Sequence, residues 1–127
     1  MKKLFLVIIA ALFVSGCAIN SNDDIFSKKK ECAELRAGIE QHLMDLNSGT
    51  ERVQLNKIFY SPKENTCLYT MTTNTVEGEI RRSYYDLYDA LTNEKVASEV
   101  GCLPRDICEK DPTQASEDFD ALIKKYE

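Results

Sequence analysis

The sequence predicts an α+β domain in which an N-terminal helix, an antiparallel β-meander of three or four strands and a C-terminal helix follow one another, cross-linked by two disulfides. Three observations support this class. Apolar residues recur at helical spacing in one segment before and one segment after the centre of the chain. The centre itself is rich in β-forming residues and is divided by turn sequences. Four cysteines follow residue 17, an even number that suits paired thiols.

The first 17 residues have the parts of a bacterial export signal. Lys2 and Lys3 form the positive end, and eleven apolar residues follow from Leu4 to Val14. A membrane-spanning helix needs roughly 20 apolar residues, so this run is too short to remain as a span. We therefore expect the segment to be cleaved.

The residues at the expected cleavage point, Val14-Ser15-Gly16-Cys17, resemble the lipobox of bacterial lipoproteins. The resemblance implies that signal peptidase II cuts before Cys17, that the sulfur of Cys17 carries diacylglycerol and that the new amino group is acylated. Ala18 is similar to the residue that follows the cysteine in outer-membrane lipoproteins, which implies an anchor on the periplasmic face of that membrane. The alternative is a soluble secreted protein in which Cys17 has no role.

These features divide the chain into a signal peptide (1–16), a lipidated cysteine with a short polar tether (17–26) and one globular domain (27–127). Without Lys2 and Lys3 the chain keeps 14 basic and 21 acidic residues, a formal charge of −7. This charge argues against a nucleic-acid partner, because phosphate backbones bind basic surfaces. Two short basic patches are exceptions: Lys28-Lys29-Lys30 is expected to be a solvated first helical turn or to lie near the membrane surface, and Arg81-Arg82 is expected to decorate a strand edge.

The expected first helix covers residues 27–47. Its apolar side chains recur at steps of three or four residues, at Cys32, Leu35, Ile39, Leu43 and Leu46. Ser27 is the expected N-cap, and Ser48-Gly49 the expected end. His42 is the only histidine; it flanks the apolar stripe, where a structural or surface role is the expected one.

The expected strands cover residues 53–60 and 66–73 as a hairpin, 79–89 after a turn at 74–78, and 96–100 as a short edge strand. The first turn, 61–65, contains Ser, Pro and Asn, which favour turns. An isolated hairpin is marginal in water, so one face of the sheet is expected to pack against the first helix.

The expected last helix begins at Pro112. Asp111 is its expected N-cap, and Gln114 completes the capping pattern. Its apolar stripe consists of Ala115, Phe119, Leu122, Ile123 and Tyr126. Lys124 and Lys125 suit the negative end of the helix dipole.

The four cysteines after residue 17 are expected to form two disulfides, since a small exported domain has a modest core and meets an oxidising compartment. Three pairings are possible, and we favour Cys32 with Cys67 and Cys102 with Cys108. From loop length alone these bonds would contribute on the order of 3.8 and 2.4 kcal/mol. A zinc site is the rival interpretation, but the chain has no Cys-x-x-Cys pair and a single histidine.

The sequence points to no catalytic residues and no cofactor. A nucleophile-base pair would depend on His42, no Gly-x-Ser-x-Gly is present, and the five glycines are too scattered for a phosphate-binding loop. Acidic clusters do not match a calcium loop and are expected to be solvated: Asp106, Glu109 and Asp111, then Glu117, Asp118 and Asp120. Six tyrosines suit recognition where strands leave them exposed: Tyr60, Tyr69, Tyr84, Tyr85, Tyr88 and Tyr126.

Two classes of function follow. In the first, the protein is a lipid-anchored, non-catalytic module that binds an envelope protein through a sheet face or an acidic surface. In the second, it is an inhibitor, immunity or exclusion lipoprotein, and its negative charge steers it to a basic toxin or cell-wall hydrolase.

Overall fold

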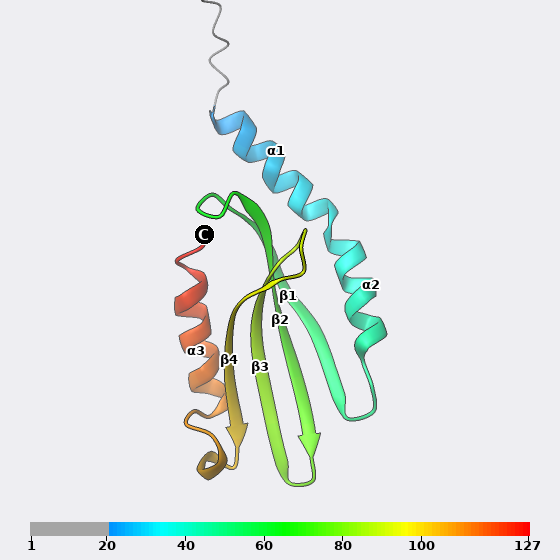
Figure 1. Cartoon of the computed structure of the whole chain (residues 1–127), viewed down its shortest axis with the longest axis vertical. Coiled ribbons are helices and arrows are strands. Elements are labelled where there is room, and N and C mark those ends of the chain that lie inside the picture. Colours follow the sequence, from blue (N-terminus) through cyan, green and yellow to red (C-terminus); the bar gives the residue numbers. More distant parts are fainter. Residues whose placement is uncertain (1–20) are drawn as a thin grey trace, which may run out of the picture.

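The computed structural model describes residues 21–127 (Figure 1). Its elements are α1 (Ser21–Glu34), α2 (Arg36–Leu46), β1 (Glu51–Ser61), β2 (Thr66–Glu77), β3 (Ile80–Asp89), β4 (Lys95–Leu103), the 3₁₀ turn η2 (Arg105–Ile107) and α3 (Pro112–Ile123). The strands form one antiparallel sheet in the order β1-β2-β3-β4. The α+β class and the meander are therefore confirmed. No helix within residues 21–127 combines the length and apolarity needed to cross a membrane.

The N-terminal helical segment differs from the prediction in where it begins and in its continuity. It begins at Ser21, so residues expected to be a tether are helical and Ser27 is not an N-cap. Asp23 and Asp24 in the first turn favour this earlier start, because carboxylates complement the positive end of a helix. The segment also breaks at Leu35, whose N–H donates to the carbonyl of Cys32 three residues earlier.

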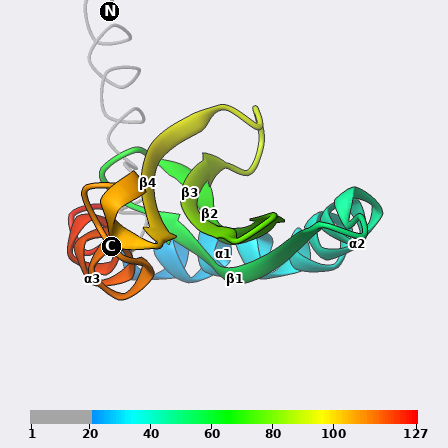
Figure 2. The same ribbon diagram turned by 90° about the horizontal axis from the view of Figure 1, so that it is seen from below.

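The helices cover both faces of the sheet. Because side chains alternate along a strand, neighbouring residues of β2 belong to opposite faces. Leu68 of β2 joins the cluster covered by α3, which includes Leu87, Phe119 and Ile123. Tyr69 joins the cluster covered by α2, which includes Leu43, Leu55 and Met71. Figure 2 shows α2 and α3 at opposite ends of the curved sheet.

The strand connections depend on residues with positive φ. Gly78 has φ 64° at the first central position of the turn between β2 and β3, as a type II′ turn requires. β2 continues to Glu77, so this turn is tighter than the predicted turn at 74–78. Asn65 (φ 52°) and Asn93 (φ 58°) serve the other two hairpins, and Asn tolerates this conformation better than most residues.

The start of α3 is confirmed. The Asp111 carboxylate accepts a hydrogen bond from the Gln114 N–H at 2.9 Å, and Pro112 lies in the first turn. The chain entering α3 packs directly on Gly101 of β4. The Tyr85 hydroxyl donates to the carbonyl of Pro112 at 3.0 Å, which ties this entry to β3 as well.

Candidate binding surface on strands β3 and β4

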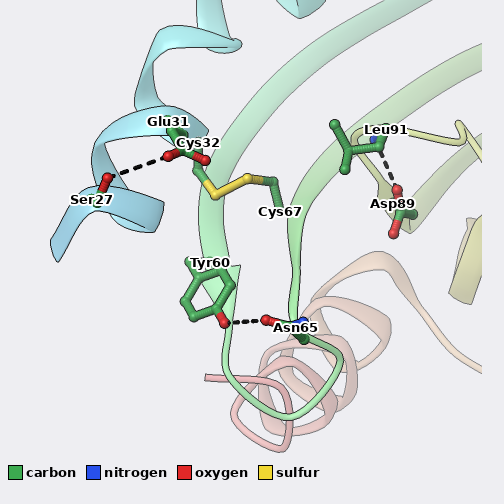
Figure 3. The surroundings of a disulfide bond; sticks show 8 residues. All are labelled: Ser27, Glu31, Cys32, Tyr60, Asn65, Cys67, Asp89 and Leu91. Carbon is green, nitrogen blue, oxygen red and sulfur yellow. Dashed lines mark hydrogen bonds between the residues drawn. A yellow bond between two sulfur atoms is a disulfide. The ribbon is translucent and has the colours of Figure 1, made fainter. Parts of the chain in front are cut away.

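Both favoured disulfides are confirmed. Cys32 and Cys67 join α1 to β2 with Cα atoms 5.4 Å apart, and their neighbourhood includes Tyr60, whose hydroxyl donates to Asn65 (Figure 3). Cys102 and Cys108 close a short loop at the end of β4, with Cα atoms 5.7 Å apart. Cys17 lies outside the described residues.

The helices of the described part of the chain, residues 21–127, leave part of one sheet face uncovered. It lies on β3 and β4, on the side opposite α3 and beyond the reach of α2. Val96 and Val100 are 38% and 39% exposed there. We call this surface the open face, and its residues are Tyr84, Val96, Ser98 and Val100.

A buried carboxylate lies at the base of the open face. Asp86 is only 4% exposed, and its Oδ1 accepts hydrogen bonds from Ser98 Oγ at 2.6 Å and from Lys95 Nζ at 2.9 Å. Partial burial lowers the pKa of Lys95, but the hydrogen bond to Asp86, its negative charge and the neighbouring Tyr88 together outweigh burial and raise that pKa overall. Asp86 is therefore neutralised by fixed partners. The sequence feature that could have pointed to this cluster is an Asp inside a run of β-forming residues, because Asp is depleted in strands.

Two tyrosines connect this cluster to α2. Tyr69 and Tyr88 stack with ring centroids 5.4 Å apart, and the Lys95 ammonium lies 5.5 Å from the Tyr88 centroid. Burial raises the pKa of Tyr69, and the neighbouring Tyr88 and Asp86 add to that increase. The Tyr69 hydroxyl therefore stays protonated and is a donor. It lines a cavity of about 240 Å³ together with exposed His42 of α2.

The outer edge of β4 is available for pairing. Cys102 N–H donates to the carbonyl of Lys110, outside the sheet, at 3.1 Å. Backbone polar groups of alternate residues in an antiparallel strand point to the same side, so those of Val100 and Ser98 also point away from β3. Within residues 21–127, no backbone hydrogen bond from outside the sheet reaches these two residues.

The outer edge of β1 differs. There, Val53 N–H donates to the Asn47 side-chain oxygen at 2.6 Å, and both α1 and α2 pack against the strand. Helix α3 likewise packs against β4, so the two edges differ in the side-chain hydrogen bond that occupies the Val53 N–H and not in helix packing.

The tyrosines are mostly structural. Tyr60 and Tyr69 are buried and the other four are partly buried, so none is a fully exposed strand residue. Tyr85 packs on Phe119 with centroids 6.0 Å apart. Tyr84 is the tyrosine that contributes to the open face.

Some residues of the acidic clusters form ion pairs within the domain, and the others are exposed to solvent. Lys110 Nζ lies 2.7 Å from Glu99 and 2.8 Å from Asp118, and the hydrogen bond to Asp118, followed by that to Glu99, raises the pKa of Lys110. Hydrogen bonds from Gln114 N–H and then Arg105 lower the pKa of Asp111. Across residues 21–127, no three His, Cys, Asp or Glu side chains gather as a metal site.

The basic patches are likewise engaged locally. The ammonium of Lys28 lies 5.6 Å from the Tyr60 ring centroid, and Lys30 pairs with Glu34 at 4.0 Å. Arg82 pairs with Glu77 at 2.7 Å. Arg81 and Arg82 lie near the start of β3, which is an inner strand of the sheet.

A larger hollow, about 550 Å³, separates α3 from β1 and β2. Its floor is polar, and Asn56 donates to the Thr72 hydroxyl at 2.7 Å. Lys57 pairs with Glu127 at its rim. These groups satisfy one another and do not form a nucleophile-base arrangement.

No family model matches this chain, and no match is found among the curated proteins or the solved structures.

Proposed function

We propose that this protein is a non-catalytic binding module, anchored through lipidated Cys17 to the periplasmic face of the outer membrane, that binds an extended segment of an envelope protein along β4. The observation that carries the proposal is the coincidence of two features at the same residues. Ser98 and Val100 direct free backbone groups outward, and they belong to the open face.

This combination suits recognition by strand addition. In that mode, main-chain hydrogen bonds supply affinity and alternate side chains supply specificity. Val96 and Val100 would contact alternate apolar side chains of the added strand, beside Tyr84. The partner is therefore a segment with alternating apolar residues, presented in an extended conformation.

The proposed compartment is supported by the two disulfides, which persist in oxidising environments such as the periplasm. The non-catalytic role is supported by the exposure of the histidine and by the hydrogen bonds that already occupy the buried carboxylate. His42 is exposed on α2, and Asp86 is held by Lys95 and Ser98.

The test begins with photo-crosslinking in intact cells from position 96 of the open face, with position 107 as a matched exposed control outside it. Val100→Pro removes an N–H that points away from β3, so the pairing between β3 and β4 is retained while an added strand loses a donor. We expect capture from position 96 and not from position 107, and we expect the capture from position 96 to be lost when the same protein carries Val100→Pro.

Amide hydrogen exchange on the purified complex then separates strand addition from other contacts. The captured partner should slow exchange at Ser98 and Val100 and leave Ala97 and Glu99 unchanged, because the latter two already face β3. Equal capture by a folded Val100→Pro variant, or protection confined to the helices, would contradict the proposal.

The inhibitor alternative draws support from a different surface, the solvent face of α3, where Glu117, Asp118 and Asp120 are exposed. If this alternative holds, the purified protein inhibits a basic cell-wall hydrolase, and Glu117→Lys with Asp120→Lys abolishes inhibition while Val100→Pro has no effect.

A further inference from the structure

The first turns of α1 extend beyond the sheet (Figure 1). Two adjacent apolar side chains lie on this segment: Phe26 is 72% exposed and Ile25 is 36% exposed. The following turns are fixed to the domain, because Cys32 is bonded to Cys67 and Lys28 lies over the Tyr60 ring. The exposed pair is therefore carried by a helix whose other end is held rigidly.

The covalent chain keeps this pair close to the proposed anchor. Cys17 precedes Ser21 by four residues, which span at most about 14 Å when extended. Phe26 is five residues further along α1, or about 7.5 Å at the helical rise. The headgroup layer on one side of a bilayer is roughly 6 Å thick, so Phe26 can reach it while Cys17 is anchored.

Basic side chains follow the apolar pair along α1. Lys29 and Lys30 follow Phe26 by three and four residues, so they lie on its side of the helix, one turn further from the anchor, and both are exposed. Asp23 and Asp24 offset part of this positive charge. The apolar pair, and not net charge, therefore provides most of the attraction.

We infer that Ile25 and Phe26 insert into the membrane–water interface beside the lipid anchor and hold the domain in one orientation on the membrane. This inference rests on the lipid anchor of the proposed function. It commits to a phospholipid surface because the length of chain to Cys17 brings the pair to that surface. The domain then stands with α1 at the membrane and the turn between β2 and β3 furthest from it.

The absence of tryptophan from the chain provides a direct test. Phe26→Trp makes position 26 the sole indole fluorophore in the full-length, lipid-modified protein. The matched control is Ile107→Trp, an exposed site on η2 at the other end of the domain. Both proteins are purified from membranes and reconstituted in vesicles of phosphatidylethanolamine and phosphatidylglycerol, with and without brominated acyl chains.

We expect a blue-shifted emission for Phe26→Trp and at least a twofold loss of its intensity in brominated vesicles, with neither change for Ile107→Trp. A smaller fraction of phosphatidylglycerol should leave the result nearly unchanged. Unquenched emission from Phe26→Trp in a protein that floats with vesicles would overturn the inference and leave the anchor intact. Equal quenching at both positions would also overturn it, because the domain would then have no fixed orientation.

The anchor has its own readout. Intact mass shows whether Cys17 carries lipid, and Cys17→Ser should abolish flotation. A native protein without lipid that does not float would reject the anchor and this inference together. Protection of Phe26→Trp by a bound protein without quenching from lipid would show that the pair contacts a protein.

Discussion

Ser98 on the edge strand β4 donates a 2.6 Å hydrogen bond to the buried carboxylate of Asp86 on the inner strand β3. The two residues face each other directly in the strand register, and Lys95 completes the arrangement at 2.9 Å. This cluster anchors the edge strand on the side where the helices do not cover it. On the open face the edge strand is therefore held by polar contacts, whereas α3 packs on its other face.

Lys95→Met should lower the free energy of unfolding by about 1–3 kcal/mol, because it leaves the Asp86 carboxylate buried with Ser98 alone. Denaturant unfolding measures this change. Lys30→Met is the control, since the 4.0 Å pair with Glu34 is exposed and should contribute less than about 0.5 kcal/mol. Equal losses for both variants would contradict a special role for Asp86.

Asp89→Asn should destabilise the fold by about 1 kcal/mol at neutral pH, as the loss of a capping carboxylate does. Burial raises the pKa of Asp89, but hydrogen bonds from the Thr92 and Leu91 N–H groups, together with the nearby Thr66 and Thr92 side chains, outweigh burial and lower that pKa overall. A lowered folded-state pKa means that the stabilisation is fully present above the unfolded value of about 3.9 and is lost as pH falls through the folded value.

Thermal unfolding of the native chain and Asp89→Asn from pH 7 down to pH 2 tests this dependence. The gap between them should narrow only below about pH 4. Asp45→Asn, on the exposed side of α2, should change stability little at any pH. A gap that is constant over the whole range would refute a role for the Asp89 charge.

The two disulfides should differ in their contributions. Cys32 and Cys67 are 35 residues apart and Cys102 and Cys108 are six apart, so loop entropy predicts losses of about 3.8 and about 2.4 kcal/mol when each pair is replaced by alanine. Unfolding in urea measures both. A larger loss from the short loop would show that local packing, and not chain entropy, dominates.

Two glycine-to-alanine substitutions should change the free energy of unfolding in opposite directions. A Cβ at Gly101 would lie 2.5 Å from the Asp111 carbonyl oxygen and 2.6 Å from the Pro112 Cα, so Gly101→Ala should cost about 1–3 kcal/mol or more. A Cβ at Gly38 meets no atom within 4 Å, and Gly38→Ala should stabilise helix α2 by about 0.5–1 kcal/mol. The melting temperature should fall for Gly101→Ala and rise for Gly38→Ala. A fall for both variants would refute the prediction for Gly38→Ala.

Local patterns in the sequence are sufficient for the element types. Helical spacing identifies the stripes of α2 and α3, and β-forming runs between turn residues identify the strands. The Asp111 cap is also local, since its partner Gln114 is three residues away. The cysteine pairing, which the structure confirms, could be predicted because Cys102 and Cys108 are close in sequence, which leaves Cys32 and Cys67 for each other.

The tertiary structure decides what depends on contacts between distant residues. The break at Leu35 turns α2 along β1, and α3 covers the opposite face over β3 and β4. Which half of each face stays open follows from this placement and not from any single strand. The outward direction of the Ser98 and Val100 backbone groups follows from register, which is a relation between strands. The sequence alone therefore determined the types of the elements and predicts an export signal, whereas packing alone decided which face and which edge of the sheet stay open.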